Sequence, residues 1–122
     1  MFEVKTTRKT EVVDITSQVE ERVKDGNACL VFTPHATAAI IVNEFEPNIK
    51  SDYEKFFSNI ANGDWKHNAI DNNAEAHLLS ALISPSILLP IKNGKLDLGT
   101  WQSIMFVESD GPRTRKVIVR IL

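Results

Sequence analysis

The chain is built of short hydrophobic runs separated by turn-forming residues, a pattern typical of β-strands. Hydrophobic and polar residues alternate with period two over 2–6, and β-branched residues follow over 11–15. The apolar runs at 30–33 and 38–42 predict two buried strands. Further strands are predicted over 86–91, from 96 onward, over 104–107 and over 117–122, with Asn93-Gly94 as the turn of a hairpin.

Three segments carry helical signals instead. Ser17 and Glu20 form a capping box that begins the first helix, which ends at Asp25-Gly26. Pro47 opens the second helix, whose apolar residues recur at helical spacing and are expected in the core: Ile49, Tyr53, Phe56, Phe57 and Ile60. Asn73 caps the third helix, whose buried face is expected to carry Ala74, His77, Leu78, Ala81 and Leu82.

Composition indicates an ordinary globular protein. Of the 122 residues, 43% are hydrophobic and 25% are charged, which suits a single domain over residues 1–122 with one core. A formal net charge of −2 gives no basic surface for nucleic acid, so we expect a small-molecule partner. No apolar stretch approaches the roughly 20 residues of a membrane span, and the N-terminus has no signal sequence. We therefore expect a cytoplasmic protein without a membrane partner.

The three histidines suggest a site. His35, His67 and His77 lie among small polar and acidic residues, and imidazole is both a metal ligand and a proton shuttle near neutral pH. Three neutral imidazoles with one open position would make a catalytic zinc centre, with Glu44 or Asp71 as its outer partner or base. In the alternative interpretation, His77 packs in the core and the other two are ordinary loop residues.

A second candidate is the basic segment that follows residue 108. On the strand predicted from Thr114, Arg115 shares a face with apolar residues and therefore needs a partner. That partner is either an anionic ligand or one of the carboxylates of Glu44, Glu108 and Asp110. The turn at Asp110-Gly111-Pro112 aims Arg113 and Arg115, and the glycine amide is a further candidate for anion binding.

A third candidate is Gly99-Thr100-Trp101-Gln102, where a tryptophan and an amide that follow a glycine suit either a planar ligand or the core. This segment and its surroundings resemble a known family. The stretches Leu96–Ile104 and Glu108–Arg115 are similar to the YjbQ-like family, described as secondary thiamine-phosphate synthases. Other matching positions are His35 with Thr37 and Ala38, Asn43-Glu44, the segment from His67 to His77 with Asp71, Asn73 and Ala74, and Pro90-Ile91 with Gly94. Ala36 and Ser84 depart from the family pattern.

The resemblance implies a single α+β domain with a mixed, largely antiparallel sheet or sandwich and about three helices. It also implies a homotrimer and histidines that hold zinc, with Mg²⁺ as the alternative cofactor. Apolar strand residues such as Ile104, Phe106, Val117 and Val119 favour burial in an oligomer only weakly.

The activity implied is that of a transferase resembling thiamine-phosphate synthase, which joins a pyrimidine diphosphate to a thiazole phosphate. The expected substrate is thus a small phosphorylated heterocycle. Expected catalytic residues are Glu44, Asp71 and Arg115, and expected substrate contacts are Thr37, Asn43, Asn73, Thr100, Trp101, Gln102, Asp110, Gly111, Arg113 and Arg115. The alternatives are a zinc-dependent hydrolase and a non-catalytic trimer that binds a metal or a metabolite.

Overall fold

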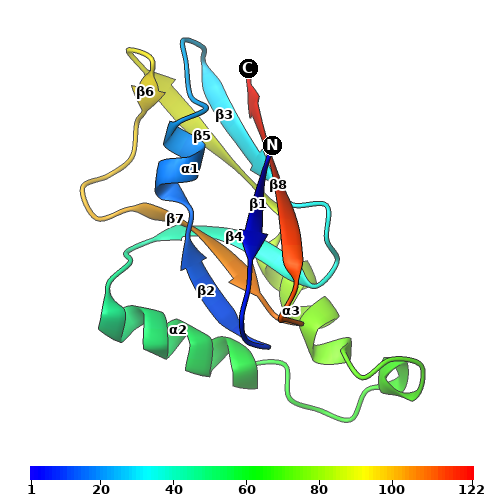
Figure 1. Ribbon diagram of the computed structural model, residues 1–122. Coiled ribbons are helices and arrows are strands. Elements are labelled where there is room, and N and C mark those ends of the chain that lie inside the picture. The colour runs from blue at the N-terminus through cyan, green and yellow to red at the C-terminus, as the bar shows by residue number, and fades with distance from the viewer.

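Eight strands form two antiparallel sheets in the computed structural model, which describes residues 1–122 (Figure 1). The five-stranded sheet has the order β1-β8-β3-β5-β6, and the three-stranded sheet has the order β2-β7-β4. The strands are β1 Phe2–Lys5, β2 Glu11–Asp14, β3 Ala28–Phe32, β4 Ala38–Asn43, β5 Ser86–Lys92, β6 Lys95–Leu96, β7 Ser103–Glu108 and β8 Thr114–Ile121. The helices are α1 Thr16–Glu20, α2 Pro47–Asn59 and α3 Ala74–Ile83, with a short 3₁₀ helix, η1, at Lys66–Ala69.

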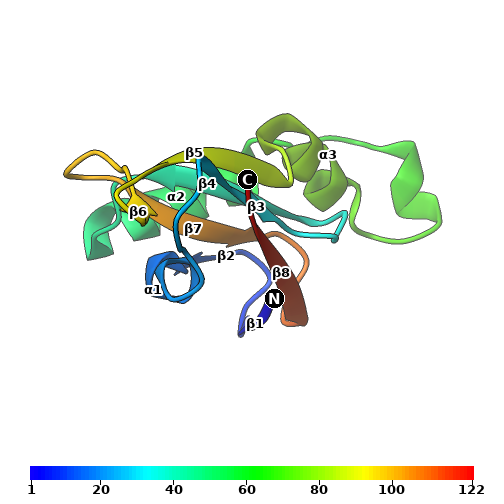
Figure 2. The ribbon, with the colours of Figure 1, turned by 90° about the horizontal axis from the view of Figure 1, so that it is seen from above.

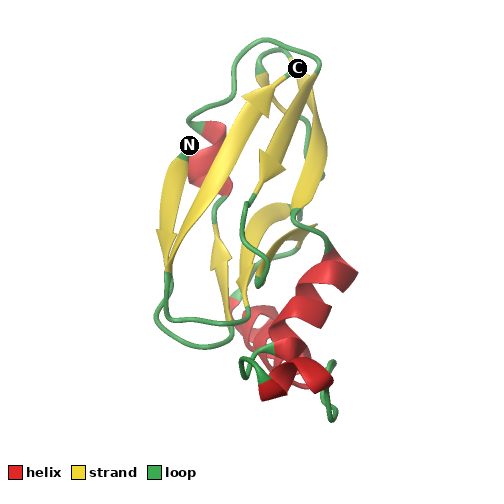
Figure 3. Cartoon of the chain, turned by 90° about the vertical axis from the view of Figure 1, so that its right-hand side faces the viewer, coloured by secondary structure: helices red, strands yellow, loops and turns green.

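The smaller sheet is covered on both faces, which explains why its central strand β7 is almost wholly buried. Ile104 and Phe106 of β7 face the main core, which they share with β1, β3, β5 and β8. Met105 and Val107 face a second cluster that includes Leu79 of α3. Figure 3 shows α2 and α3 gathered at one end of the strands, and Figure 2 shows α1 and α3 on opposite sides of them. No helix is both long and apolar enough to cross a bilayer.

The hairpin predicted at Asn93-Gly94 is confirmed. Both residues have positive φ, 54° and 73°, as a two-residue turn between strands requires, and they join β5 to β6. The expected capping box of the first helix is wrong. α1 begins after Ile15, whose apolar side chain cannot cap the helix, and the Thr16 hydroxyl accepts a hydrogen bond from the backbone amide of Ile104 at 2.9 Å, which ties the start of the helix to β7. The helix also ends at Glu20 rather than at Asp25-Gly26.

Helix α2 begins at Pro47 as predicted, but only part of its apolar stripe packs on the core. Tyr53 and Phe57 are partly buried against the second cluster, whereas Phe56 and Ile60 are 58% and 41% exposed. The helix is turned so that Glu54 faces the sheet and accepts a hydrogen bond from the backbone amide of Val12 at 2.9 Å. Because β2 is an edge strand, this amide has no strand partner, and satisfying it outweighs burying another aromatic ring.

The buried face of α3 also differs from the predicted one. Its buried residues are Ala74, Ala76, Leu79 and Ser80, whereas Leu78 and Leu82 are 42% and 70% exposed. The helix carries its own apolar residues on every face, so their spacing in the sequence does not identify the face that packs on the sheet. The true orientation turns His77 and Leu78 outward, toward the candidate site.

Candidate functional site

The site centres on a chain of hydrogen bonds that links an exposed histidine to a carboxylate. Nε2 of His67 lies 2.8 Å from Oδ1 of Asn73, and Nδ2 of Asn73 donates to Asp110 at 3.0 Å. His67 belongs to η1, Asn73 immediately precedes α3, and Asp110 follows β7. The Asn73 amide, which we expected to cap the helix, is thus held between the other two side chains.

This series of hydrogen bonds defines the tautomer of His67. A carboxylate oxygen only accepts, so the amide nitrogen of Asn73 must face Asp110 and its carbonyl oxygen must face His67. The carbonyl oxygen also only accepts, so Nε2 of His67 carries a proton. In the neutral imidazole, the other nitrogen, Nδ1, is then an unprotonated acceptor. An exposed histidine oriented by a second and a third group is the arrangement of a general base.

Behind Asp110 lies a buried ion pair. Glu108 accepts from Nε of Arg115 at 2.8 Å and from Nη2 of the same guanidinium, and it also accepts from the hydroxyl of Thr6 at 2.8 Å. Burial by itself would raise the pKa of Glu108, but the hydrogen bonds from Arg115 and Thr6 outweigh it and lower that pKa. Arg115 also donates to the hydroxyl of Thr37 at 2.8 Å. The partner of Arg115 is therefore Glu108 within the chain rather than an anionic ligand, and Thr37 is bonded to Arg115 rather than directed at a substrate.

Arg113 behaves differently from Arg115. Its side chain is 53% exposed, and it is held over the turn by bonds from Nε to the Asp110 carbonyl at 2.8 Å and from Nη2 to the Asp110 carboxylate at 3.2 Å. Gly111 supports the turn sterically, because a Cβ there would lie 2.3 Å from the Arg8 carbonyl oxygen. The Gly111 amide donates to the Lys9 carbonyl at 3.1 Å and is therefore not directed at an anion.

His77 lies between two open hollows. Its ring meets the His67 ring edge to face, with centroids 4.9 Å apart. One hollow, of about 350 Å³, is lined by both histidines with Trp65, Lys66 and Leu78. The other, of about 480 Å³, runs from His77 to His35 over apolar residues. Both volumes are in the range that small-molecule sites occupy.

The three-histidine metal centre is wrong for this chain. Nε2 of His35 accepts the backbone amide of Lys116 at 2.9 Å, so its lone pair is engaged. No group of three histidine, cysteine, aspartate or glutamate side chains is arranged to hold a metal ion. Zinc or Mg²⁺ as a cofactor stays a prediction that metal analysis of the purified protein tests.

His35 makes stability depend on pH. Burial, and after it the positive charge of Arg115, lowers the pKa of His35 below its ordinary 6.5. The unfolded chain therefore takes up this proton more readily, and stability is lost as the pH falls from 6.5 toward the lowered pKa. We expect His35→Gln, which keeps an acceptor for the Lys116 amide, to flatten the melting temperature between about pH 7 and 5. Calorimetric melts check this, and equal slopes in both proteins would contradict it.

Several predicted site residues lie elsewhere. Asn43 pairs with Ser103 at one end of the β4–β7 ladder, whereas Ala38 pairs with Glu108 at the other end, about 17 Å away for strands of this length. The Asn43 end of the ladder carries the remaining predicted site residues, namely Asn43, Glu44, Thr100, Trp101 and Gln102. Within one chain these five residues do not join the histidines. Asp71 is exposed beside η1, and its backbone carbonyl accepts a hydrogen bond from the backbone N–H of Asn73 at 2.8 Å.

Trp65 and Leu78 also line the site, although the sequence pattern did not indicate either residue. Trp65 is fixed by a bond from its Nε1 to the Ala61 carbonyl at 2.8 Å, and its ring packs over Gly63, where a Cβ would come within 2.6 Å. The glycine two residues before a tryptophan in a loop was the available signal. Leu78 was assigned to the core, so nothing in the local pattern placed it here.

Comparisons with known proteins agree with this architecture. A family model described as "UPF0047 protein YjbQ-like" matches residues 1–122. A UPF0047 protein of Archaeoglobus fulgidus is 44% identical over 122 residues, which cover 98% of this chain and 97% of that protein. The crystal structure of a hypothetical protein of Aeropyrum pernix has a TM-score of 0.94 at 44% identity and covers 99% of this chain and 95% of its own. A YbjQ-like protein of unknown function from Sulfolobus solfataricus has a TM-score of 0.92 at 41% identity, covering 98% and 92%.

The fold and these matches define a small α+β domain with antiparallel sheets and three helices. The chain belongs to the YjbQ-like UPF0047 family. The resemblance seen in the sequence is therefore confirmed over the whole chain.

The predicted thiamine-phosphate synthase activity is wrong. Neither the family nor the relatives carry that name, and a solved relative is described as of unknown function. The prediction also placed the reaction at a histidine–metal centre that the chain does not form. The zinc-dependent hydrolase required the same centre and is wrong for the same reason.

Proposed function

We propose that the chain binds a small phosphorylated heterocycle beside His67 and His77 and that His67 accepts a proton from it. The observation that supports this function is the chain of hydrogen bonds from Asp110 through Asn73 to His67. It holds the imidazole in one orientation and leaves Nδ1 as a proton acceptor. A base oriented in this way typically accelerates a reaction by about 10²- to 10⁴-fold.

The charges around the hollow favour an anionic ligand. Lys66 lines the same hollow as His67 and makes no ion pair. Arg113 does not line the hollow, but it is bonded to Asp110, which is linked to His67 through Asn73, and its Nη1 has no partner in the chain. The lysine ammonium suits the oxygens of a phosphate group.

The walls of the hollow favour a ring. Trp65, the His77 imidazole and Leu78 provide two aromatic surfaces and an apolar one. Because Trp65 is fixed at its Nε1, its ring is a preorganised stacking surface rather than a mobile one. A heterocycle seated here would place its ring atoms near His67.

Proton transfer at this site needs only residues of the chain. When Nδ1 of His67 takes a proton, Nε2–H still donates to Asn73, and Asn73 still donates to Asp110. The carboxylate of Asp110 therefore stabilises the imidazolium through the amide, in the way that a buried carboxylate supports a catalytic histidine.

Isothermal titration calorimetry tests this function. Pyridoxine 5′-phosphate, uridine 5′-monophosphate and histidinol phosphate represent phosphorylated pyridines, pyrimidines and imidazoles, with inorganic phosphate and pyridoxine as controls. We expect saturable binding of at least one phosphorylated compound, tighter than that of either control. Absence of binding by all three phosphorylated compounds would contradict the function.

The homotrimer is also part of the proposal. The outer face of the five-stranded sheet carries Leu88, which is 61% exposed, beside the partly buried Leu30, Phe32 and Ile118. Leu30 pairs with Leu88, and Phe32 pairs with Ile118, so these side chains form one continuous surface. Such a surface supports association between copies. Ile104, Phe106 and Val117, which we had cited for an oligomer, are buried within the single chain instead.

Sedimentation velocity tests the assembly. We expect the wild-type protein to sediment as a trimer and Leu88→Asp to sediment as a monomer, because a charge on this face opposes its burial. Phe56→Asp is the matched control, since Phe56 is similarly exposed but lies on α2. A concentration-independent wild-type monomer would reject the trimer.

A further inference from the structure

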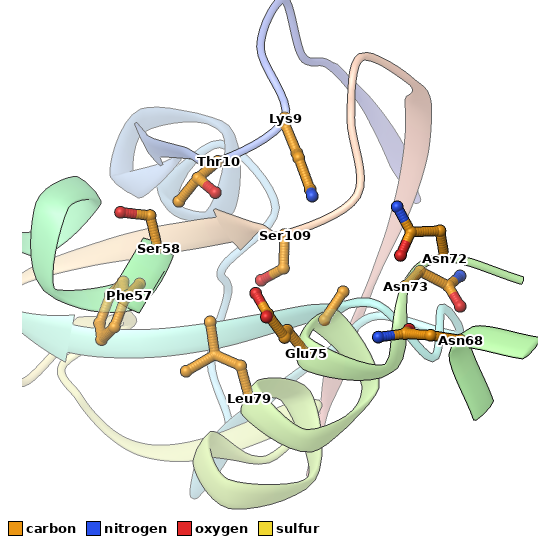
Figure 4. A pocket seen from close by; sticks show the side chains of 11 residues that line it. Lys9, Thr10, Phe57, Ser58, Asn68, Asn72, Asn73, Glu75, Leu79 and Ser109 are labelled. Atoms are coloured by element: carbon orange, nitrogen blue, oxygen red, sulfur yellow. The ribbon is translucent and has the colours of Figure 1, made fainter. Parts of the chain in front are cut away.

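A third pocket lies on the other side of Asn73, between the helices and the loop that joins β1 to β2 (Figure 4). Its volume is about 180 Å³, close to the roughly 150 Å³ of a cavity that holds benzene. Lys9 and Thr10 come from the loop, Phe57 and Ser58 from α2, and Ser109 from the end of β7. The remaining walls belong to η1 and to the first turns of α3: Asn68, Asn72, Asn73, Glu75, Ala76 and Leu79.

The pocket contains opposite charges that do not neutralise each other. Lys9 makes no ion pair, and neither does Glu75, which lies in the first turn of α3. Figure 4 shows Lys9 reaching in from the loop and Glu75 reaching in from the helix. A ligand with one negative and one positive group would complement both.

Ser109 provides an independent sign that the pocket is incomplete without an occupant. The residue is 6% exposed, and its Oγ is buried without any hydrogen-bond partner. A buried hydroxyl without a partner destabilises the fold, because it has lost its hydrogen bonds to water. In Figure 4 the side chains of Ser109 and Glu75 point toward each other, yet they form no hydrogen bond. An ammonium group between them would donate to both.

The opposite side of the pocket suits a carboxylate. The Oδ1 of Asn68 accepts the Ala74 amide at 2.9 Å, which leaves the Nδ2 donor of Asn68 free, and Asn72 has no side-chain bond. These amides and the Lys9 ammonium are donors for carboxylate oxygens. Phe57 and Leu79 add an apolar wall for a short hydrocarbon side chain.

We propose that this pocket binds a small zwitterion of the α-amino acid type. Its ammonium group lies between Glu75 and Ser109, its carboxylate faces Lys9, and its side chain packs on Phe57 and Leu79. The proposal is separate from the function of His67, because both polar atoms of Asn73 are engaged by His67 and Asp110 and leave none for the second ligand.

NMR titration of the ¹⁵N-labelled full chain tests the proposal with glycine, L-alanine, L-serine and L-valine. We expect at least one amino acid to shift the backbone signals of Ser109 and Glu75 with saturation. Isobutylamine and isovalerate, which lack the carboxylate and the ammonium of valine respectively, should cause no saturable shift. If no amino acid binds, or if the two analogues bind as well as valine, the proposal is overturned.

Variants of Glu75 and Lys9 test whether these two charged side chains bind the amino acid. Glu75→Gln and Lys9→Met should each weaken amino-acid binding at least tenfold, whereas Glu20→Gln and Lys24→Met, both exposed near α1, should leave it unchanged. Ser109→Ala should weaken binding while leaving the melting temperature equal or higher, because it removes an unsatisfied hydroxyl. Unchanged affinity in both Glu75→Gln and Lys9→Met would refute the site. His67→Ala should not affect it, so failure of the two proposals can be told apart.

Discussion

Replacing Arg115 by methionine is expected to lower the free energy of unfolding by about 3–5 kcal/mol, the usual cost of removing one partner from a buried ion pair. Arg115 is 3% exposed, and Glu108 is fully buried. Without the guanidinium, Glu108 would remain in the core as a carboxylate that keeps only Thr6 and the amides of Ser109 and Asp110. Urea denaturation measures the loss.

Two further variants separate this cause from a general effect of the substitution. Lys24→Met removes an exposed cation that makes no ion pair and should change the free energy of unfolding by no more than about 0.5 kcal/mol. The double variant Arg115→Met with Glu108→Gln should be more stable than Arg115→Met alone, because it removes the stranded charge. If Arg115→Met cost less than about 1 kcal/mol, the ion pair would not stabilise the fold as argued.

The second large effect concerns ligand binding. His67→Ala should weaken binding of the phosphorylated heterocycle by about 10- to 100-fold, equivalent to the roughly 1.5–3 kcal/mol of a hydrogen bond that involves a charged group. His67 is exposed, so the melting temperature should change little. Calorimetric titration and thermal melts of the same preparation measure the two quantities.

Asn73→Leu provides the contrast to His67→Ala. Asn73 is buried, and its loss leaves Asp110 without its amide donor and frees the His67 ring to rotate. We expect this variant to lose both affinity and stability, the latter by about 1–3 kcal/mol. Full affinity in His67→Ala would show that the ligand does not contact the imidazole.

The strands and the hairpin could be predicted because their signals are local. Alternation over two residues and an Asn-Gly pair act within a few positions of the chain. The orientation of a helix is a different matter. α2 turns Glu54 toward the amide of Val12, and α3 turns Leu78 outward, and both choices depend on a sheet that is distant in sequence.

The candidate site could be predicted only in part, for a similar reason. The histidines and the segment after Glu108 were recognised by residue type, and the structure does bring His67, His77, Asn73, Asp110 and Arg113 together. Residue type does not show which groups are already engaged. His35 accepts the amide of Lys116, a bond across 81 positions of the chain, and that bond removed it from the expected metal centre.

The most direct test of the histidine site is a long-range ¹H–¹⁵N correlation spectrum of protein labelled at the histidine ring nitrogens. In the free protein, the account predicts that the neutral form of His67 carries its proton on Nε2, with Nδ1 unprotonated. When the phosphorylated heterocycle that binds in calorimetry is added, the Nδ1 signal of His67 should shift toward that of a protonated nitrogen. A proton on Nδ1 in the free protein, or a His67 spectrum unchanged at saturating ligand, would contradict the account.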